Sequence, residues 1–485
     1  KRGFVYPEGG ATHPSPAKGA LVGLLAQVTF ALDQIQPGSP NIRILVRVTR
    51  FLTQGRVMRM FCWVTLLALA QGCSLLKADY QMWENDKTVY FTGIVETDHE
   101  AHGPLVVVLY RKGVQPVPVY INVIPRQRGV YHLGVPGDLA TGSYGIVAFE
   151  DVDEDTQYST GDPFSVYSGK ALSVSAINDP PSESEGLGHI VIAGTSVNAV
   201  PPPVFGEAYD ALLKRREQSF GGQVSIGQSR FDAAQVREGM FQPLKFVSEG
   251  QVGLFMLQPF DPGKVPVVFV HGIGGSPRDW IDVIANLDKE HFQPWVAYYP
   301  SGASIGYSAL MLSSAMNELR YRHPYADSVI VAHSMGGLVA MSSLNIAMRE
   351  GRVPPVHLLV TISTPWLGNR AARWAQAAPT RALDSWLDIA PDSDFLDSIF
   401  AYPRPPGLCH SLFYGSGGSS IFVKGENDGV VALSSVLPSS ATSRADQVVG
   451  FDEGHESILR SDAMHDELNR RLATYLRNPA CKTLQ

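Results

Sequence analysis

The most constraining feature of this chain is the segment at residues 328–340, where an apolar run meets a serine and then a set of small residues. The run up to Val331 is β-branched and apolar, which is typical of a strand buried on both faces of a parallel sheet. After the small-residue turn around Ser334 the sequence becomes rich in Ala, Met and Leu, which favours a helix. The segment therefore predicts a strand, a tight turn with a serine at its apex, and a helix.

The turn matches the nucleophile-elbow pattern G-x-S-x-G, with Ala332 in place of the first glycine. At such a turn the serine adopts a strained backbone conformation, so the flanking positions Ala332 and Gly336 must be small for strand and helix to pass closely. This geometry lifts the hydroxyl of Ser334 clear of the sheet and directs the first N–H groups of the helix at a bound group. Because serine and glycine are common, the motif alone is weak evidence.

The composition is that of an ordinary globular protein. The chain has 485 residues, of which 45% are hydrophobic and 18% charged, enough for two or three domains. Its formal net charge is −7, which argues against nucleic acid as a partner.

The first residues look like targeting sequence rather than a folded domain. Residues 1–57 contain no methionine and show no sustained period, so we expect that they are not part of the mature protein. Residues 58–72 combine a minimal positive region with a ten-residue apolar run, which is typical of a signal peptide and too short for a permanent membrane span. Residues 70–73 (AQGC) resemble the lipobox of bacterial lipoproteins, which implies lipidation of Cys73. A plain signal peptide or a buried helix is the alternative.

The lipoprotein resemblance sets expectations for location and attachment. Ser74, by similarity to enterobacterial lipoproteins, implies the outer membrane, facing the periplasm or the cell surface. Residues 1–72 carry eight positive and two negative charges, so the mature chain would have a net charge of −13. This leaves the acyl chains on Cys73 as the membrane attachment. Cys409 and Cys481 either pair in an oxidising periplasm or remain free buried thiols.

Residues 73–178 predict a small all-β sandwich. Short alternating segments recur between Gly, Pro and Asp, at 88–95, 105–110, 117–123 and 143–149. Residues 142–151 resemble the transthyretin-like or carboxypeptidase-regulatory type of module. Because this domain carries no catalytic set of residues, we interpret it as a spacer or docking domain, followed by a linker at 179–187.

An acidic segment follows the last of these strands. Asp151, Asp153 and Asp155 alternate, and clustered carboxylates on a loop are the ligands that calcium prefers. Thr156, however, stands where an EF-hand loop needs glycine. A solvated acidic turn is therefore the favoured interpretation, and we expect no metal.

Residues 188–480 predict an α/β domain. Apolar runs alternate with helical segments: strands are expected at 188–193, 253–257, 265–270, 295–300 and 357–364, and helices at 208–218 and 304–322. This order predicts right-handed crossovers and a doubly wound, mostly parallel sheet. The glycine-rich residues 271–275 have neither a Walker lysine nor G-x-G-x-x-G spacing, so phosphate binding is not expected.

Two carboxylates are candidates for the acid that would act with Ser334. Asp428 follows an expected strand at 420–424 and precedes an apolar pair that would bury it. A buried carboxylate in this position suits the role of orienting and stabilising an imidazolium. Glu426 is the alternative.

His455 is the candidate base, because it lies in the loop after an expected strand at 447–451 and is downstream of the acid. The other histidines are assigned elsewhere. His271 is expected to be structural beneath the glycine loop, His410 lies in an inserted region, and His465 is expected at the surface.

Four motifs together resemble the α/β-hydrolase superfamily and, within it, bacterial lipases and lipase-like esterases. They are AHSMGG at 332–337, HGIGG at 271–275, STPWLG at 363–368 and NDGVV at 427–431. The resemblance implies a triad of Ser334, Asp428 and His455, with an oxyanion hole formed by the N–H groups of Ile273 and Met335. It implies no cofactor.

Residues 369–413 are expected to form a cap or lid with several large apolar side chains. Such an insertion either closes over an acyl-binding cleft as a mobile lid or packs permanently on the sheet. A mobile apolar lid would favour lipid substrates.

The sequence therefore predicts a serine carboxyl-ester hydrolase, of lipase or esterase type, that acts through an acyl-enzyme on lipid or other acyl esters in the bacterial envelope. One alternative is a thioesterase or amidase of the same fold. Another is an inert hydrolase scaffold that serves as a surface binding protein.

Overall fold

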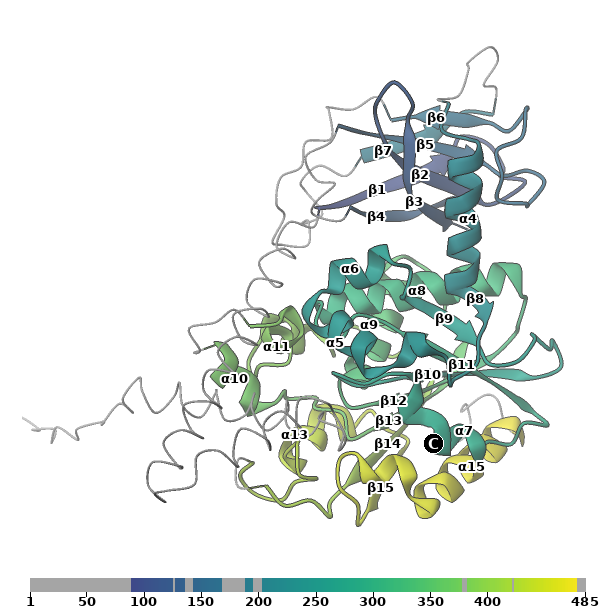
Figure 1. Cartoon of the computed structure of the whole chain (residues 1–485). Coiled ribbons are helices and arrows are strands. Elements are labelled where there is room, and N and C mark those ends of the chain that lie inside the picture. The colour runs from purple at the N-terminus through teal and green to yellow at the C-terminus, as the bar shows by residue number, and fades with distance from the viewer. Residues whose placement is uncertain are drawn as a thin grey trace, which may run out of the picture.

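The computed structural model describes residues 89–124, 127–135, 143–167, 188–194, 203–376, 382–420 and 423–477. Residues 1–57, the expected signal peptide, Cys73, the linker at 179–187 and Cys481 lie outside them. In Figure 1 the described chain forms a β-sandwich above a larger α/β part.

The N-terminal part is an all-β sandwich of two sheets, as predicted. One sheet has the strand order β4-β1-β7 and the other β3-β2-β5-β6. The strands are β1 (Val89–Thr97), β2 (Leu105–Arg111), β3 (Val117–Ile124), β4 (Arg128–Val135), β5 (Tyr144–Glu150), β6 (Phe164–Val166) and β7 (Gly188–Ile192). The pairs are antiparallel except that β1 and β7 run in parallel.

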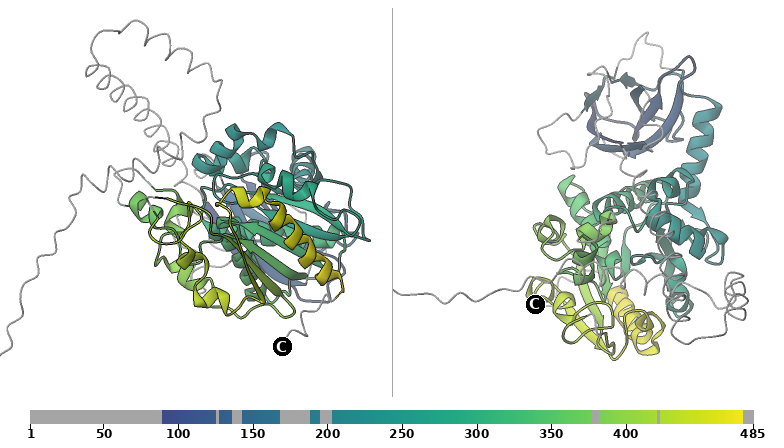
Figure 2. Two further views of the ribbon diagram at one scale, coloured as in Figure 1. Left: turned by 90° about the horizontal axis from the view of Figure 1, so that it is seen from below. Right: turned by 60° about the vertical axis from the view of Figure 1, so that its left-hand side comes forward.

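Strand β2 is buried on both faces, which explains its continuous apolar sequence. Leu105 and Val107 pack in the core between the two sheets. Val106 points the other way and packs in a second cluster with Tyr209 of α4 (Glu207–Ser219). The helix therefore covers the outer face of the sheet that contains β2. Figure 1 and the right view of Figure 2 show α4 beside the sandwich.

The sequence assigned two elements to the α/β domain that the structure places with the β-sandwich, so this part of the prediction is wrong. Residues 188–193 do form a strand, but β7 pairs with β1, with Ile190 opposite Val95. The predicted helix at 208–218 exists as α4, yet its buried residues Tyr209 and Leu213 pack on the outer face of the β-sandwich. Local sequence predicts a strand or a helix, whereas the partner is set by long-range contacts.

An ion pair connects α4 to the α/β part. Arg216 of α4 pairs with Glu318 of α8 (Ile305–Arg322), and their side chains are only 8% and 4% exposed. Arg216 also donates to the carbonyl oxygen of Ile121 in β3. One guanidinium thus contacts the β-sandwich and α8 at once, in a site from which water is largely excluded.

We expect Arg216→Met to lower the free energy of unfolding by about 3 kcal/mol, because the carboxylate of Glu318 would stay buried without its closest cation. The double variant Arg216→Met/Glu318→Leu should recover most of this loss, since the buried carboxylate is gone and Arg322, its second partner, is partly exposed to water. Urea denaturation followed by circular dichroism measures both. An equal loss in the single and double variants would show that charge balance is not the cause.

The α/β part is built on one eight-stranded sheet of order β15-β14-β13-β12-β10-β11-β9-β8. Its strands are β8 (Phe220–Gln223), β9 (Gly253–Met256), β10 (Val265–Val270), β11 (Phe292–Tyr298), β12 (Ser328–His333), β13 (Val356–Ile362), β14 (Cys409–Gly415) and β15 (Gln447–Phe451). Neighbouring strands are parallel except β9 and β11. The doubly wound, mostly parallel sheet is therefore confirmed, and the fold is the α/β-hydrolase fold.

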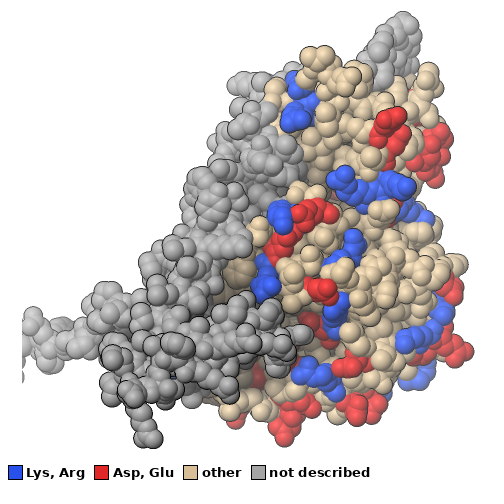
Figure 3. Space-filling view, in the orientation of Figure 1, with Lys and Arg blue, Asp and Glu red and all other residues tan. Residues whose placement is uncertain are grey.

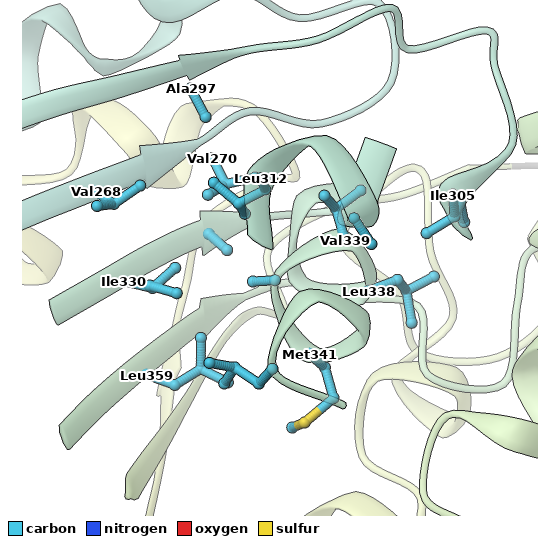
Figure 4. Packing of buried hydrophobic residues seen from close by; sticks show 14 of the residues in the cluster. Val268, Val270, Ala297, Ile305, Leu312, Ile330, Leu338, Val339, Met341 and Leu359 are labelled. Atoms are coloured by element: carbon cyan, nitrogen blue, oxygen red, sulfur yellow. The ribbon is translucent and has the colours of Figure 1, made fainter. Parts of the chain in front are cut away.

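Helices cover both faces of this sheet. They are α5 (Ala233–Phe241), α6 (Pro243–Ser248), α7 (Ile281–Ala285), α8, α9 (Met335–Arg349), α10 (Arg370–Gln376), α11 (Asp384–Asp388), α12 (Asp394–Ser398), α13 (Leu433–Val436), α14 (Ser439–Thr442) and α15 (Asp462–Arg477), with 3-10 turns at Ser229–Phe231, Pro277–Trp280 and Ser457–Arg460. Ile330 packs with α8 and α9 on one face, as Figure 4 shows. Val329 and Val331 pack on the other face with residues of α7 and α15. Burial on both faces is why these strands are uniformly apolar.

The inserted region contains a strand that the sequence reasoning missed. Residues 409–415 form β14, so the expected insertion at 369–413 ends earlier, and His410 lies in the sheet rather than in a lid. The expected strand at 420–424 is not a strand in its described residues. Cys409 is disulfide-bonded, which rules out a free thiol there, and the other three cysteines lie outside the described residues.

On the face in Figure 3, basic and acidic side chains are interspersed rather than gathered into one patch. Among the described helices, none combines the length and the apolar character needed to cross a membrane.

Candidate active site

Ser334 occupies the turn between β12 and α9, where the elbow pattern places it. Its backbone has a φ of 54° and a ψ of −130°, a conformation that L-residues rarely adopt. The N–H of Ser334 donates to the carbonyl oxygen of Ile362 at 2.8 Å, which ties the strained turn to β13. The hydroxyl does not cap its own helix. It is therefore left for other partners.

Small residues beside Ser334 are required by close packing. A Cβ at Gly336 would lie 2.4 Å from the carbonyl oxygens of both Val270 and His271. A Cβ at Gly272 would lie 2.9 Å from the Cβ of Ser334. Backbone segments of β10 and α9 thus approach at distances that only glycine permits. This is the physical basis of the sequence requirement at Gly336.

His455 lies within hydrogen-bonding distance of Ser334. Its Nε2 is 2.9 Å from the Oγ of Ser334, and its Nδ1 is 2.6 Å from Oδ2 of Asp428. The backbone N–H of His455 also donates to the carbonyl oxygen of Asp428 at 2.7 Å. With Nδ1 protonated toward the carboxylate, Nε2 is free to accept the serine proton. The loop after β15 delivers the histidine, as the sequence predicts.

Asp428 is a buried carboxylate that the surrounding groups keep ionised. Its Oδ1 accepts the N–H groups of Val430 and Val431 at 3.0 and 2.7 Å. Burial acts to raise the pKa of Asp428, but His455 and these two donors outweigh it and lower the pKa. Glu426, the alternative acid, is exposed to solvent. The structure thus brings Asp428, and not Glu426, to the histidine.

The glycine-rich loop after β10 lies beside the elbow. Met335 is the first residue of α9, and N–H groups in the first turn of a helix have no intrahelical acceptor. Ile273 lies in the glycine-rich loop that faces the start of α9. The next residue, Gly274, holds this loop in position, because the N–H of Gly274 donates to the Oγ of buried Ser301 at 3.0 Å. Ser301, from the segment after β11, is a residue that sequence reasoning did not identify. No local pattern marks it.

His271 supports the same loop, as expected, and takes no part in the contacts of Ser334. Its ring stacks on Tyr299, with ring centroids 4.2 Å apart, and its Nδ1 is 2.8 Å from the carbonyl oxygen of Gly272. The hydroxyl of Tyr299 donates to the carbonyl oxygen of His271. Burial lowers the pKa of His271 to about 4, so the ring is neutral at pH 7.

His333, which precedes the serine, is a second residue that the sequence reasoning missed. Its Nε2 is 2.9 Å from the carbonyl oxygen of His455, and burial lowers its pKa to about 3. A neutral ring donates this hydrogen bond and holds the backbone of His455 in place. Its position next to Ser334 in the sequence was the available signal.

Two further histidines that the sequence singled out, His410 and His465, are both buried. His410 in β14 has its Nε2 2.8 Å from the Oγ1 of Thr361. His465 was expected at the surface, but it is buried, with Nε2 2.9 Å from the carbonyl oxygen of Leu459 and Nδ1 3.1 Å from the Nδ2 of Asn286. Both histidines thus make hydrogen bonds within the core, and none of these partners is Ser334.

Comparison with known families supports the fold assignment. Residues 267–463 match the model of the alpha/beta hydrolase family. This stretch begins in β10 and ends in α15, so it contains the elbow, the acid loop and the loop of His455. No curated protein matches the chain.

Solved structures similar to part of this chain include a bacterial lipase, a bacterial gene product and a fungal lipase. The mature lipase BlEst2 of Bacillus licheniformis is 20% identical, with a TM-score of 0.38 over 45% of this chain and 97% of that one. The lin2722 gene product of Listeria innocua is 16% identical, with a TM-score of 0.34 over 43% of this chain and 94% of that one. Lipase B of Aspergillus fumigatus is 16% identical, with a TM-score of 0.31 over 41% and 49%. At these values the likenesses carry no argument about substrate.

Proposed function

We propose that this chain, with its α/β-hydrolase fold, is a serine hydrolase that cleaves carboxylic esters through an acyl-enzyme. The observation that carries this proposal is the unbroken series of hydrogen-bond distances from Ser334 through His455 to the buried, ionised Asp428. Three groups in this order form a nucleophile, a base and a group that orients the base.

The proposed acylation step uses all three side chains. Nε2 of His455 takes the hydroxyl proton as the Oγ of Ser334 attacks the ester carbonyl carbon. Asp428 stabilises the imidazolium that results. His455 then returns the proton to the leaving alkoxide, which departs as an alcohol. A water molecule repeats the sequence on the acyl-enzyme and releases the carboxylic acid and free Ser334.

The negative oxygen that develops in both steps needs hydrogen-bond donors. We assign them to the backbone N–H groups of Ile273 and Met335, which lie on the two sides of the elbow turn. Loss of one such donor typically costs a factor of about 10² to 10³ in kcat. The hydrogen bond from Gly274 to Ser301 holds the loop of Ile273 in position before substrate arrives.

The region between β13 and β14 favours a fixed cap over a mobile lid. Ile389, Leu396 and Ile399 are buried in the same core cluster as residues of α8 and α9. The carboxylate of Asp388 accepts the N–H of Ile305 at 2.6 Å, which ties the cap to the start of α8. Opening such a cap would expose part of the core. We therefore propose an esterase that acts on dispersed acyl esters without needing a lipid interface.

The proposed setting is the bacterial envelope, with the chain anchored through a lipidated Cys73. This rests on the sequence at residues 58–73 and on its resemblance to lipoproteins. The β-sandwich, which we compare with transthyretin-like modules, would then act as a spacer between the membrane and the catalytic domain. Substrate and membrane are the partners proposed, and nucleic acid is not among them.

We expect the purified chain to hydrolyse nitrophenyl esters with an optimum at short or medium acyl chains and with no jump in rate when substrate forms an interface, because the cap is packed into the core. A chain-length series on either side of the solubility limit measures this. A long-chain optimum with interfacial activation would instead establish a mobile lid. Activity only on thioesters or amides would move the assignment to those classes, and no activity on any of them would favour a binding protein.

A further inference from the structure

A second cluster of chemically active side chains lies in the β-sandwich, away from Ser334. His99 and His102 belong to the connection between β1 and β2, and Glu150 is the last residue of β5. Leu105, the first residue of β2, pairs with Glu150, so this connection passes directly over the carboxylate. One ligand atom from each of His99, His102 and Glu150 lies within 4.8 Å of the others.

The carboxylate of Glu150 is fully buried, at 0% exposure of its side chain. Its Oε2 is 2.6 Å from the Nε2 of His99, and its Oε1 is 3.5 Å from the Nδ1 of His102. Oε1 also accepts the backbone N–H of His102. A buried carboxylate is costly unless a positive charge compensates it. No lysine or arginine pairs with Glu150 among the described residues, so the compensation must come through the histidines.

His99 lies between two carboxylates. Its Nδ1 is 3.0 Å from Oδ1 of Asp98, while its Nε2 is 2.6 Å from Glu150. A neutral imidazole has a single N–H and can donate to only one of them. The other carboxylate then faces a ring nitrogen lone pair, which is repulsive. The ring nitrogen that faces the second carboxylate therefore needs a positive charge beside it, supplied either by a proton or by a metal ion.

We propose that His99, His102 and Glu150 bind a divalent cation of the zinc class. Two imidazoles and a carboxylate are a donor set that zinc accepts, with a fourth position left for water. A hydrogen bond from the second ring nitrogen to a carboxylate, as His99 makes to Asp98, is the arrangement that orients metal-binding histidines. Asp98 is itself held by the N–H of Gly194 at 3.1 Å.

The geometry needs only small adjustments to admit the ion. Ligand atoms of a tetrahedral zinc site are about 3.3 Å apart, given bonds of about 2.0–2.1 Å. The contacts of Glu150 with His99 and His102 bracket that separation, at 2.6 and 3.5 Å. The side chain of His102 is 70% exposed, which leaves it free to adjust and gives the ion a path from solvent.

The acidic loop that follows Glu150 does not offer a comparable site. Both oxygens of Asp151 accept backbone N–H groups, from Asp155 and Thr156, at 3.1 and 2.8 Å. Asp162 likewise accepts the N–H groups of Val152 and Ser159. These carboxylates hold the turn itself, so the calcium alternative gains no support. The nitrogen donors at His99 and His102 also disfavour calcium, which prefers oxygen.

The proposal is tested by isothermal titration of ZnCl₂ into the whole chain after chelator treatment. We expect one site per chain that His99→Ala and His102→Ala each abolish or weaken by about a hundredfold or more, and that Asp98→Asn weakens by about 10- to 100-fold. His189→Ala is the matched control, because His189 of β7 is an exposed histidine that pairs with Glu96 in the same domain. The His189→Ala variant should bind zinc with the same affinity as the parent protein.

Folding is checked separately by the thermal melting of each variant without metal. His102→Ala is the decisive variant, because this exposed side chain can be removed without opening the core. Zinc should raise the melting temperature of the parent and of His189→Ala, but not that of His102→Ala. If the parent binds no zinc, or if all variants bind it equally, the proposal is overturned and the cluster is an ion pair between a protonated His99 and Glu150.

Discussion

Replacing Ser334 by alanine is expected to lower kcat for ester hydrolysis by about 10⁵- to 10⁶-fold, because the attacking oxygen is lost while the oxyanion donors remain. Steady-state assays with a nitrophenyl ester measure the change. The fold should persist, since alanine fits the space of serine and the backbone bond from residue 334 to Ile362 does not involve the side chain.

Ser363→Ala is the matched control for this variant. Ser363 directly follows the neighbouring strand β13, is buried, and also has a positive φ, of 50°. Its Oγ accepts the N–H of Gly415 and makes no contact with His455. We expect its activity to stay within about tenfold of the parent. A Ser334→Ala protein that kept comparable activity would refute the serine mechanism.

The second large effect is expected at the acid. Asp428→Asn should reduce kcat by about 10⁴-fold with little change in fold, because an amide cannot stabilise the imidazolium and favours the wrong tautomer of His455. The lowered pKa of Asp428 means that the carboxylate is ionised across the neutral range. Rates measured from pH 5 to 9 should therefore stay low throughout rather than recover at one extreme.

Glu426→Gln distinguishes the two carboxylates that the sequence offered. Glu426 lies two residues away on the same loop but is exposed, so its substitution should change kcat by no more than about twofold. The reverse pattern, with a severe loss at Glu426 and a mild one at Asp428, would mean that the loop rearranges when substrate binds and that the acid has been misassigned.

Strands with both faces buried were the elements that the sequence predicted best. All of β10 and the four central positions of β12, residues 329–332, are apolar because helices cover both faces of the sheet, so a continuous run is a sufficient signal. β14 was missed because His410 and Ser411 interrupt its apolar run. Their polar atoms are satisfied by Thr361 and by Arg471, partners that are distant in sequence. A strand of this kind is stabilised by contacts that no local pattern reports.

The sequence by itself determined the elements and the order of the chemistry: a serine at a strand-to-helix turn, followed by an acid and a histidine after later strands. These follow from local periodicity and from small residues that allow close packing. Only the tertiary structure decided which carboxylate meets His455, that His333 holds it from 122 residues away, and that His99 meets Glu150 across 51 residues. Such contacts depend on how strands are ordered in the sheets, and hydrophobic pattern does not encode the partner of a strand.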